Sequence, residues 1–423
     1  MISIIKCFFI LNENLNIDMT LYSMDFEFSD NLKNVKSSEI RDLLKYIHLS
    51  DMISFGGGLP NPETFPSQEI KNILDDIIDN YASSALQYGQ TDGLAYLKNE
   101  LKNYLLKDEN ININPDNMMI TTGSQQALYA LTKIFANPND YVITEAPTYV
   151  GMISSLNANS VRAVSVNMDN HGMITDDLEN KLKMLKSMGI KPKFIYTIPT
   201  FQNPAGYTMD LDRRKHLLEI AYDYNIPVIE DNPYGDLRYS GNKLPTLKSL
   251  DANDIVTYLG TFSKVMAPGL RTGFTLSQPE VIHRFNMLKQ SLDLASDSLS
   301  QYIAYEYLKR GIIYEQVPKT IELYKRKRDI MLESLDDNME NAEWSRPDGG
   351  MFLWVKLNKN IDSSKMLKRA IENKVAYVTG SAFYYNNPEK NTMRLNFTYS
   401  KDDDIKEGIK RLAKTINEEM KNY

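Results

Sequence analysis

Short strand-like runs alternate with helical segments between residues 97 and 276, and this alternation constrains the fold more than any other feature. The runs are rich in β-branched residues: MMITT (118–122), YVITEAP, VRAVSVN, KFIYTIP, IPVIEDN, IVTYLGTFS and TGFTLS. Helical patterns lie among them, such as QQALYALTKIF and LDRRKHLLEIAYDYN (211–225), the second preceded by Asp210 as a good N-cap. Strands that alternate with helices predict an α/β fold with a mostly parallel sheet covered on both faces.

The pattern changes after about residue 300. A long charged helix (IELYKRKRDIMLESL) is followed by the strand-like stretches GGMFLWVKL and TMRLNFTYS and by a closing helix, which together predict a smaller α+β domain. The charge runs there are typical of solvated helix faces. We therefore expect a weakly constrained extension (1–36), a helix-containing arm that contributes to the active site (37–65), a large domain (66–300) and a small domain (301–423).

Composition excludes several classes of function. The net charge of -7 argues against a nucleic-acid-binding face. A single cysteine, Cys7, cannot form a disulfide within the chain and fits a reducing cytoplasm. The four histidines are scattered without metal-ligand spacing, and no apolar run is long enough to span a bilayer. We expect a cytoplasmic protein without metal, nucleic-acid or membrane partners.

Polar residues stand where several of the predicted strands end. Asn203 follows one strand, Asp231 and then Tyr234 end the next, and Lys264 follows a third in TFSKVMAPGLRTGF. Ligands bind at this edge of an α/β sheet. Taken singly, Asp231 and Asn203 could serve turns, and Lys264 could be a solvated loop lysine. The stretch TTGSQQAL places Ser124 at a helix start that could hold a phosphate, although a lone motif of this kind more often serves simple capping.

An amine, a carboxylate, a phenol, an amide and a phosphate cradle are together what a pyridoxal phosphate site requires. With them the sequence resembles the pyridoxal-phosphate-dependent aminotransferases of fold type I, class I/II, in the branch containing 2-aminoadipate and kynurenine aminotransferases. The resemblance runs from about Ser37 to the C-terminus. It rests on SFGGGLPNPETFP, LQYGQTDGLAYLKNEL, TTGSQQAL, EAPTYVG, QNPAG, EDNPYGDLRY, TFSKVMAPGLRTGF, DGGMFLWVKL and MRLNF, in the family's order. It implies a large domain with a mostly parallel seven-stranded sheet and a smaller α+β domain.

The resemblance also implies a role for each matching residue. Lys264 would hold the cofactor covalently and then act as the base that moves a proton during the reaction. Asp231 would pair with the pyridine nitrogen, and Tyr234 and Asn203 would hydrogen-bond the ring's phenolic oxygen. Tyr149 would stack on the ring. The phosphate ligands would be Ser124, Gln125, Thr261, Ser263, Arg271 and, reaching the neighbouring subunit's phosphate, Tyr88.

Three further residues are implied at the substrate, together with Asn203. Arg394, in MRLNF, would bind the substrate α-carboxylate through a forked salt bridge, where the alternative is a surface arginine on an edge strand. Gly58 would let the backbone approach the substrate closely. Arg41 would meet a side-chain carboxylate of the substrate, and an ordinary helix charge explains it equally well.

The resemblance implies an aminotransferase that acts as a homodimer with shared active sites. The amino group would pass from an L-amino acid (2-aminoadipate, glutamate, aromatic or branched-chain) to a 2-oxo acid, with 2-oxoglutarate expected, in a ping-pong cycle. A pyridoxal-phosphate-dependent C–S lyase, or another enzyme on the same scaffold, is the alternative. A cofactor-sensing regulator is a third reading, but it would need a DNA-binding domain ahead of Arg41, where roughly 40 residues stand.

Overall fold

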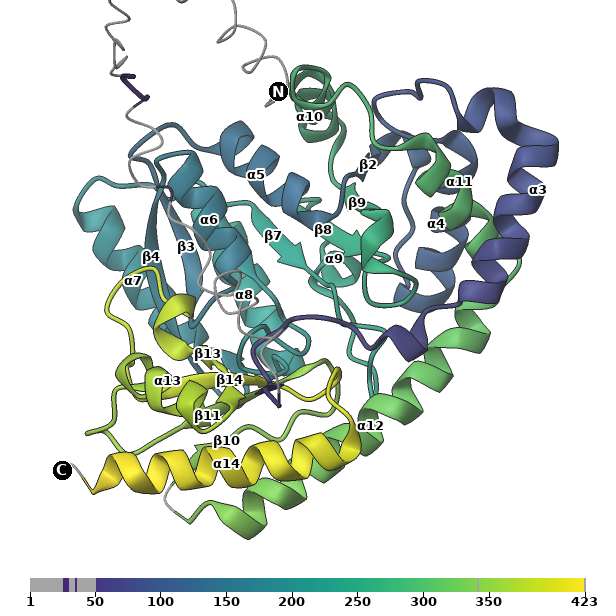
Figure 1. Ribbon diagram of the computed structural model, residues 1–423. Coiled ribbons are helices and arrows are strands. Elements are labelled where there is room, and N and C mark those ends of the chain that lie inside the picture. The colour runs from purple at the N-terminus through teal and green to yellow at the C-terminus, as the bar shows by residue number, and fades with distance from the viewer. Residues whose placement is uncertain (1–25, 30–34, 36–50, 341, 422–423) are drawn as a thin grey trace, which may run out of the picture.

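The computed structural model describes residues 26–29, 35, 51–340 and 342–421. Within these residues, no helix combines the length and apolar character needed to cross a membrane. Two sheets organise the chain, a large one in the centre of the molecule and a smaller one beside α14 (Figure 1). We call the two parts of the molecule built around these sheets the large unit and the small unit.

An eight-stranded sheet forms the centre of the large unit. Its strands, in sheet order, are β2 (Met118–Thr121), β9 (Gly273–Leu276), β8 (Val256–Thr261), β7 (Val228–Asp231), β6 (Ile195–Thr197), β3 (Tyr141–Ala146), β4 (Arg162–Asp169) and β5 (Gly172–Met173). Only β9 and β5 run in the direction opposite to the other six strands, so the predicted mostly parallel sheet is confirmed. The strand beyond the expected seven is β5, whose two residues are too short to leave a periodic pattern.

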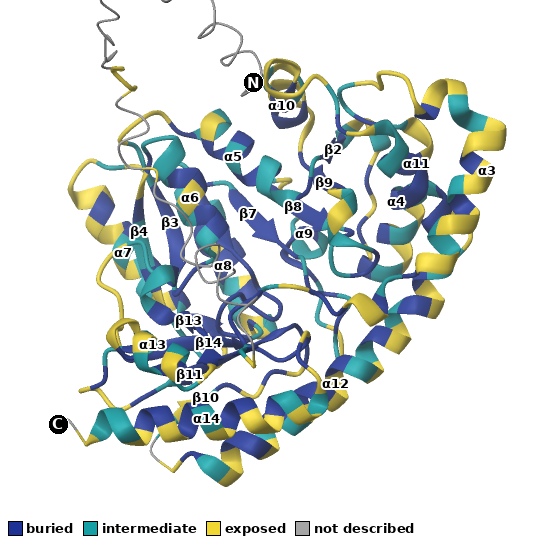
Figure 2. Ribbon diagram, viewed as in Figure 1, coloured by how far each residue is buried: buried dark blue, intermediate teal, exposed yellow. Residues whose placement is uncertain are grey.

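The strands of this sheet are buried on both faces because their apolar side chains alternate between two cores. Val142 and Ile229 point into a core shared with α5 and α6, whereas their neighbours Ile143 and Val228 point into a core shared with α7 and α8. In Figure 2 the strands are correspondingly dark blue between helices with exposed outer faces. This burial fixes the strand register and therefore the position of every strand end.

Helices cover the sheet in three groups. One face carries α5 (Ser124–Phe135), α6 (Val150–Ala158) and α10 (Pro279–Leu292), and the other carries α7 (Thr175–Ser187), α8 (Leu211–Tyr224) and α9 (Leu247–Leu250). At the β2 edge, α3 (Ser67–Ala85), α4 (Ala95–Glu109) and α11 (Ser298–Lys309) pack together. The helix expected at 211–225 is α8, and Asp210 is its N-cap residue. The Asp210 carboxylate makes no capping bond, because it accepts from His171 Nδ1 at 2.7 Å.

The small unit is an antiparallel sheet packed on two long helices and a shorter one. Its strands, in order, are β10 (Glu343–Trp344), β11 (Phe352–Lys356), β14 (Thr392–Asn396) and β13 (Val378–Thr379). The helices are α12 (Ile312–Asn338), α13 (Ser363–Glu372) and α14 (Asp402–Met420). A short parallel pair joins β1 (Ile53–Ser54) to β12 (Val375–Ala376), which ties the segment before α3 to this unit. That pairing brings the following glycines towards β14.

Parallel strands deliver their carboxyl ends to one edge of the sheet. Thr197, Asp231 and Thr261 are the last residues of β6, β7 and β8, which are adjacent in the sheet. The residues that follow them therefore emerge together, and the small unit faces them with β11 and β14. This edge is where the predicted site residues should meet.

Candidate active site

A cavity of about 280 Å³ lies at this edge, between the strand ends of the large unit and strands β11 and β14. We call it the strand-end cavity. Among the residues that the structure describes, every predicted site residue except Tyr88 lies on its wall. The lining residues are Gly58, Ser124, Gln125, Tyr149, Val150, Ile198, Asn203, Asp231, Pro233, Tyr234, Thr261, Ser263, Lys264, Arg271, Phe352 and Arg394.

Asp231 is a buried carboxylate with one oxygen in use. Its Oδ2 accepts from the Tyr196 hydroxyl at 2.9 Å, whereas its Oδ1 is buried without a partner among the described residues. Burial, together with repulsion from the neighbouring Glu230, raises the pKa of Asp231 to about 7. A buried, unpaired acceptor carries a desolvation cost that a cationic donor would offset. Asp231 is therefore prepared to receive such a donor.

Lys264 lies in the loop after β8, with its ammonium held only by a backbone carbonyl. Nζ donates to Gly58 O at 3.2 Å, and no carboxylate among the described residues pairs with it. Burial, together with repulsion from Arg394 and Arg271, lowers the pKa of Lys264 to about 8. Desolvation and neighbouring cations both favour the neutral amine, which is the nucleophilic form.

A chain of hydrogen bonds joins three of the predicted residues. Arg394 Nη1 donates to Asn203 Oδ1 at 3.0 Å, and Asn203 Nδ2 donates to the Tyr234 hydroxyl at 3.2 Å. Arg394 is only 1% exposed, and its guanidinium stacks over Phe352 at 4.1 Å. Among the described residues no carboxylate pairs with it, and its Nε lacks a partner. A buried arginine of this kind is a site for a carboxylate that is not part of the protein.

The start of α5 forms the other end of the cavity. Gly123, with φ of 72°, precedes the helix, and a Cβ there would overlap the Arg271 guanidinium. Glycine is therefore required at this turn, both for its backbone conformation and for the approach of Arg271. N–H groups at a helix start, together with an arginine, can bind an anion such as a phosphate.

Three other predicted phosphate ligands differ in the hydrogen bonds that their side chains already make within the protein. Thr261 Oγ1 donates to Ser263 Oγ at 3.0 Å, and both residues line the cavity together with Lys264. The Gln125 side chain instead donates to Gly151 O at 2.9 Å and to Ser155 Oγ at 3.1 Å, both on α6. Its amide nitrogen is therefore already in use, and a contact from Gln125 to an anion would come from its backbone N–H.

The remaining predicted residues differ in position. Tyr88 lies outside the strand-end cavity and is 86% exposed. Arg41 lies outside the described residues. A Cβ on Gly58 would lie 3.7 Å from Phe352 Cζ and 3.9 Å from Arg394 Nη2, which are ordinary contacts. Folding therefore does not require glycine at position 58, and a side chain there would instead occupy space next to Arg394.

Sequence reasoning missed two aromatic residues that support the site. Tyr196 holds Asp231, and Phe352 packs edge-on against Tyr234 with ring centroids 5.9 Å apart while its face meets Arg394. Both stand in apolar strand-like runs, where an aromatic residue is usually core. The only available signal was the hydroxyl of Tyr196 inside the buried run KFIYTIP.

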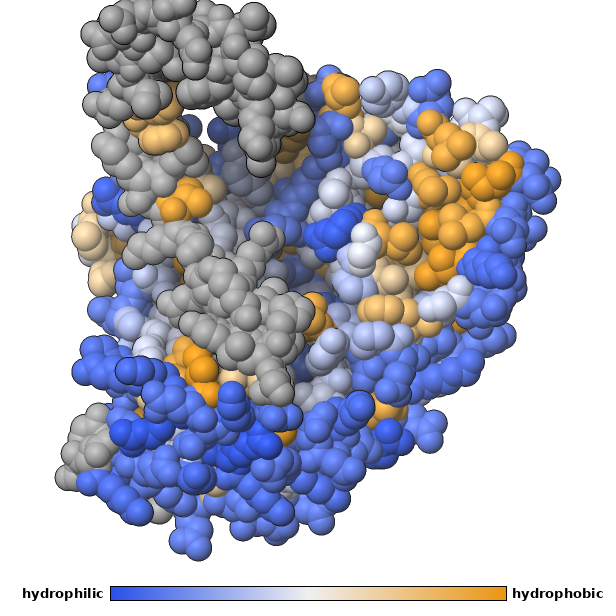
Figure 3. Space-filling model, viewed as in Figure 1, coloured by the Kyte–Doolittle hydropathy of each residue, from blue (hydrophilic) through white to orange (hydrophobic). Residues whose placement is uncertain are grey.

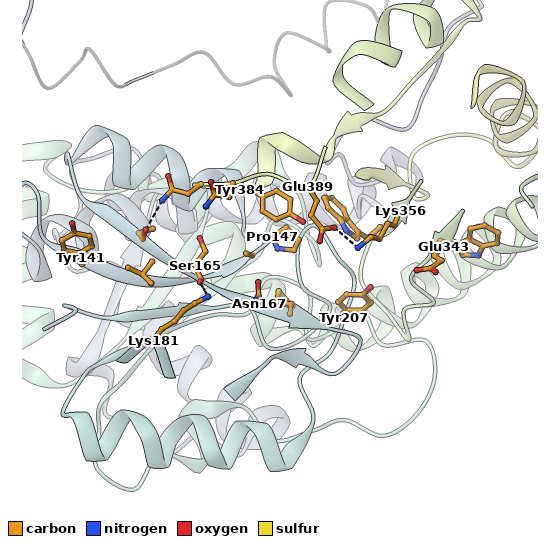
Figure 4. A pocket seen from close by; sticks show the side chains of 18 residues that line it. Tyr141, Pro147, Ser165, Asn167, Lys181, Tyr207, Glu343, Lys356, Tyr384 and Glu389 are labelled. Carbon is orange, nitrogen blue, oxygen red and sulfur yellow. Dashed lines mark hydrogen bonds and ion pairs between the residues drawn. The ribbon is translucent and has the colours of Figure 1, made fainter. Parts of the chain in front are cut away.

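A larger hollow of about 780 Å³ lies elsewhere between the two units (Figure 4). It is lined by β4, α7, β10, β11 and the loop at 384–389, and we call it the aromatic groove because Tyr141, Tyr207, Trp344, Trp354 and Tyr384 line it. Its two lysines are both paired. If volume were the only criterion, the aromatic groove would be the candidate site, but none of the predicted site residues line it.

The residues of the strand-end cavity fit pyridoxal phosphate on three counts. The unpaired Asp231 oxygen suits a protonated ring nitrogen, the turn at Gly123 with Arg271 suits a phosphate, and the Lys264 amine suits covalent attachment to an aldehyde. Arg394 then remains for a substrate carboxylate. No group that this chemistry needs is missing from the wall.

Comparisons with known proteins agree with this fit. The family model for aminotransferase class I and II matches residues 51–412. The chain is 45% identical over 414 residues to aromatic-amino-acid aminotransferase 1 of Thermococcus litoralis, covering 97% of this chain and 99% of that protein.

Two solved structures share the architecture closely. Kynurenine aminotransferase of Pyrococcus horikoshii, solved in complex with PMP, is 49% identical with a TM-score of 0.90, covering 93% of this chain and 97% of that one. The α-aminoadipate aminotransferase of Thermus thermophilus, solved with N-(5'-phosphopyridoxyl)-L-leucine, is 34% identical with a TM-score of 0.87, covering 94% and 98%. The chain belongs to the class I and II aminotransferases and is a transaminase of fold type I that depends on pyridoxal phosphate.

Proposed function

We propose that the strand-end cavity holds the cofactor and that the enzyme transfers the amino group of 2-aminoadipate, glutamate, aromatic or branched-chain amino acids to a 2-oxo acid, with 2-oxoglutarate as the main acceptor. The observation that carries this proposal is the unpaired Oδ1 of Asp231 in one cavity with the Lys264 amine. The named relatives act on aromatic amino acids, kynurenine and 2-aminoadipate, which supports a broad range of donors.

The cofactor, when bound, supplies an electron-withdrawing ring that takes up the electron pair left at the substrate Cα. Asp231 would keep a proton on the ring nitrogen, since the cation there stabilises the carboxylate in turn. Tyr234 and Asn203 would bind the ring's phenolic oxygen, and Tyr149 would lie against the ring face. Lys264 Nζ would hold the cofactor covalently. Once the substrate has released it, Nζ would carry a proton between the substrate Cα and the C4′ atom of the cofactor.

The phosphate would lie at the start of α5. Ser124 and the Gln125 backbone N–H would donate to it from the helix, and Thr261 and Ser263 from the β8 loop. Arg271 would add a charge-assisted bond.

Arg394 would bind the substrate α-carboxylate and so select the reaction. Fixing that carboxylate sets which Cα bond stands perpendicular to the ring, and this favours loss of a proton over loss of CO2. Gly58, from the arm at 37–65, would leave space for the substrate beside Arg394. In this arrangement residues 66–300 hold the cofactor and residues 301–423 supply the substrate arginine.

The active unit would be a homodimer with shared sites. Leu86, Tyr88 and Leu294 are exposed by 66%, 86% and 58%, and Ser298 Oγ donates to Gln87 O at 3.1 Å, which holds their two segments together. In Figure 3 apolar side chains gather over the region where α3, α4 and α11 lie in Figure 1. A second copy of this chain on such a surface would let Tyr88 reach the neighbouring phosphate. The single cysteine supports a reducing, cytoplasmic setting.

A donor panel with 2-oxoglutarate tests the reaction. We expect glutamate formation from 2-aminoadipate and from aromatic and branched-chain donors, with parallel-line kinetics of a ping-pong cycle. Release of pyruvate from a sulfur amino acid without any acceptor would instead identify a C–S lyase. Arg41→Ala should weaken use of 2-aminoadipate much more than use of leucine or phenylalanine, and equal losses would count against a role for Arg41 at the side chain.

A further inference from the structure

Lys289, on α10, is a fully buried cation directly behind the turn that leads into α5. Its side chain is 0% exposed. Nζ donates to Gln126 Oε1 at 2.9 Å, to Asp293 Oδ1 at 2.9 Å and to Ser296 Oγ at 2.9 Å. These bonds use all three protons of the ammonium.

The partners of Lys289 converge on Thr122. Gln126 Oε1 also accepts from the Thr122 backbone N–H at 2.9 Å, and Asp293 Oδ2 accepts from the Thr122 hydroxyl at 3.0 Å. The third polar group, the Thr122 carbonyl, accepts from Arg271 Nη2 at 3.4 Å. Every polar group of Thr122 is thus held, either by the partners of Lys289 or by Arg271.

Thr122 immediately precedes Gly123 and Ser124, so holding Thr122 fixes the turn at the phosphate end of the strand-end cavity. Burying the Lys289 ammonium costs desolvation free energy, and an apolar side chain of similar size would pack there as well or better. The ammonium therefore contributes something other than packing. Its geometry points to placement of this turn.

We propose that Lys289 is a positioning residue for the cofactor phosphate, acting through Gln126 and Thr122 on the turn before α5. The inference rests on the proposed binding of the phosphate at this turn. Without the ammonium, Gln126 Oε1 would lose one of its two donors, and the Asp293 carboxylate, which accepts from Gln126 Nε2 at 2.6 Å, would lose its cationic partner.

The test compares pyridoxal phosphate with pyridoxal, which lacks only the phosphate. Full-length protein freed of cofactor is titrated with each compound, for wild type, Lys289→Met and the matched control Lys327→Met. Lys327 is also a buried lysine, 3% exposed and bonded to Ser400 O at 2.6 Å, but it lies on α12 outside the cavity lining. We expect Lys289→Met to weaken pyridoxal phosphate binding about tenfold and pyridoxal binding less than twofold, with neither changed in Lys327→Met.

A second variant guards against a loss of folding. Gln126→Met removes the acceptor between Lys289 and Thr122 and leaves the Lys289–Asp293 ion pair in place, so it should show the same phosphate-selective loss. The double variant should lose no more than the worse single variant, because each single variant already breaks the Lys289–Gln126–Thr122 contact. Equal losses for the two compounds, unchanged binding in Gln126→Met, or losses that multiply in the double variant would overturn the inference. Failure of wild type to bind pyridoxal phosphate would instead overturn the proposed function.

Discussion

The strand-end cavity and the aromatic groove are both hollows with lysines in their walls, yet they differ in how those lysines are satisfied. In the larger groove Lys181 bonds to Asp177 at 2.9 Å and Lys356 to Glu389 at 3.0 Å. In the smaller cavity Lys264 has only a backbone carbonyl, and Asp231 and Arg394 each keep a buried atom without a partner among the described residues. Unsatisfied charge that folding has buried, rather than volume, marks the place prepared for a ligand.

A second comparison lies inside the large unit. Glu145 and Asp231 are both buried carboxylates whose pKa is raised to about 7 by burial. Glu145 accepts from Thr197, from the Ile198 backbone and from Gln202, so both of its oxygens are in use. A raised pKa therefore does not separate a structural carboxylate from one prepared for chemistry. The two carboxylates are distinguished instead by Oδ1 of Asp231, which has no partner among the described residues.

The largest expected effect comes from the lysine of the strand-end cavity. Lys264→Ala should slow amino transfer at least about 10³-fold, because both covalent attachment and proton transfer are lost. The single-turnover rate with glutamate measures this directly. Lys181→Ala, in the aromatic groove, is the control. A single-turnover rate of Lys264→Ala within tenfold of the wild-type rate would contradict the distinction between the two hollows.

The two buried carboxylates should respond differently to neutralisation. Asp231→Asn should slow the reaction about 10²-fold or more while the cofactor stays attached to Lys264, since a charge that acts on the reacting ring is lost. Glu145→Gln should slow it less than tenfold and lower the free energy of unfolding, because the new amide faces donors. Rate constants and urea unfolding of the two variants check this. Similar rate losses in both would contradict the distinction.

The substrate arginine should show its role through substrate choice. Arg394→Gln should lower kcat/KM for amino acids by about 10- to 100-fold, because a charge-assisted bond to the α-carboxylate is lost. An amine of the same length without a carboxylate should react equally with both enzymes. A loss of the same size for the amine would assign Arg394 a purely structural role.

Lys264 should destabilise the cofactor-free protein at neutral pH. Its pKa falls from 10.5 to about 8, chiefly through burial, so between these values the folded state binds fewer protons than the unfolded state and stability rises with pH. Lys264→Met should therefore be more stable than wild type near pH 7 by on the order of 1 kcal/mol, allowing for solvent screening. Urea unfolding of the two proteins across this range should show the difference shrinking as the pH rises, and a constant difference would refute the assigned cause.

The smallest effect is expected in the aromatic groove. Lys356→Met breaks the exposed ion pair with Glu389, and such pairs contribute about 0–1 kcal/mol. We expect kcat and KM with any amino donor to stay within about twofold of wild type. A large loss would show that the groove takes part in the reaction.

Much of the fold and of the site wall was predictable from sequence because both depend on local patterns. β-branched runs marked the seven longer strands of the large sheet, and parallel strands necessarily bring their ends together, so Asn203, Asp231 and Lys264 were expected to meet. The two residues of β5 gave no periodic signal. Asp210 is the N-cap residue of α8 as expected, although its carboxylate makes no capping bond and instead pairs with His171, which is distant in sequence.

The hydrogen-bond partners and the burial of each site residue were not predictable, since they depend on neighbours that only the fold brings together. Tyr196 takes one oxygen of Asp231 and leaves the other, and Gly151 and Ser155 engage the Gln125 amide. In the sequence Lys289 looks like one more helical lysine, although the fold buries its side chain completely behind the turn that precedes α5. Contacts of this kind follow from tertiary packing and leave no local pattern.

The central claim is that the cofactor is held at Lys264, in the smaller of the two hollows. The most direct measurement is borohydride reduction of the holoenzyme followed by digestion and mass mapping of the modified peptide. The account predicts a pyridoxyl group on the peptide that contains Lys264 and none on Lys181 or Lys356. A pyridoxyl group on another lysine, with Lys264 unmodified, would contradict it.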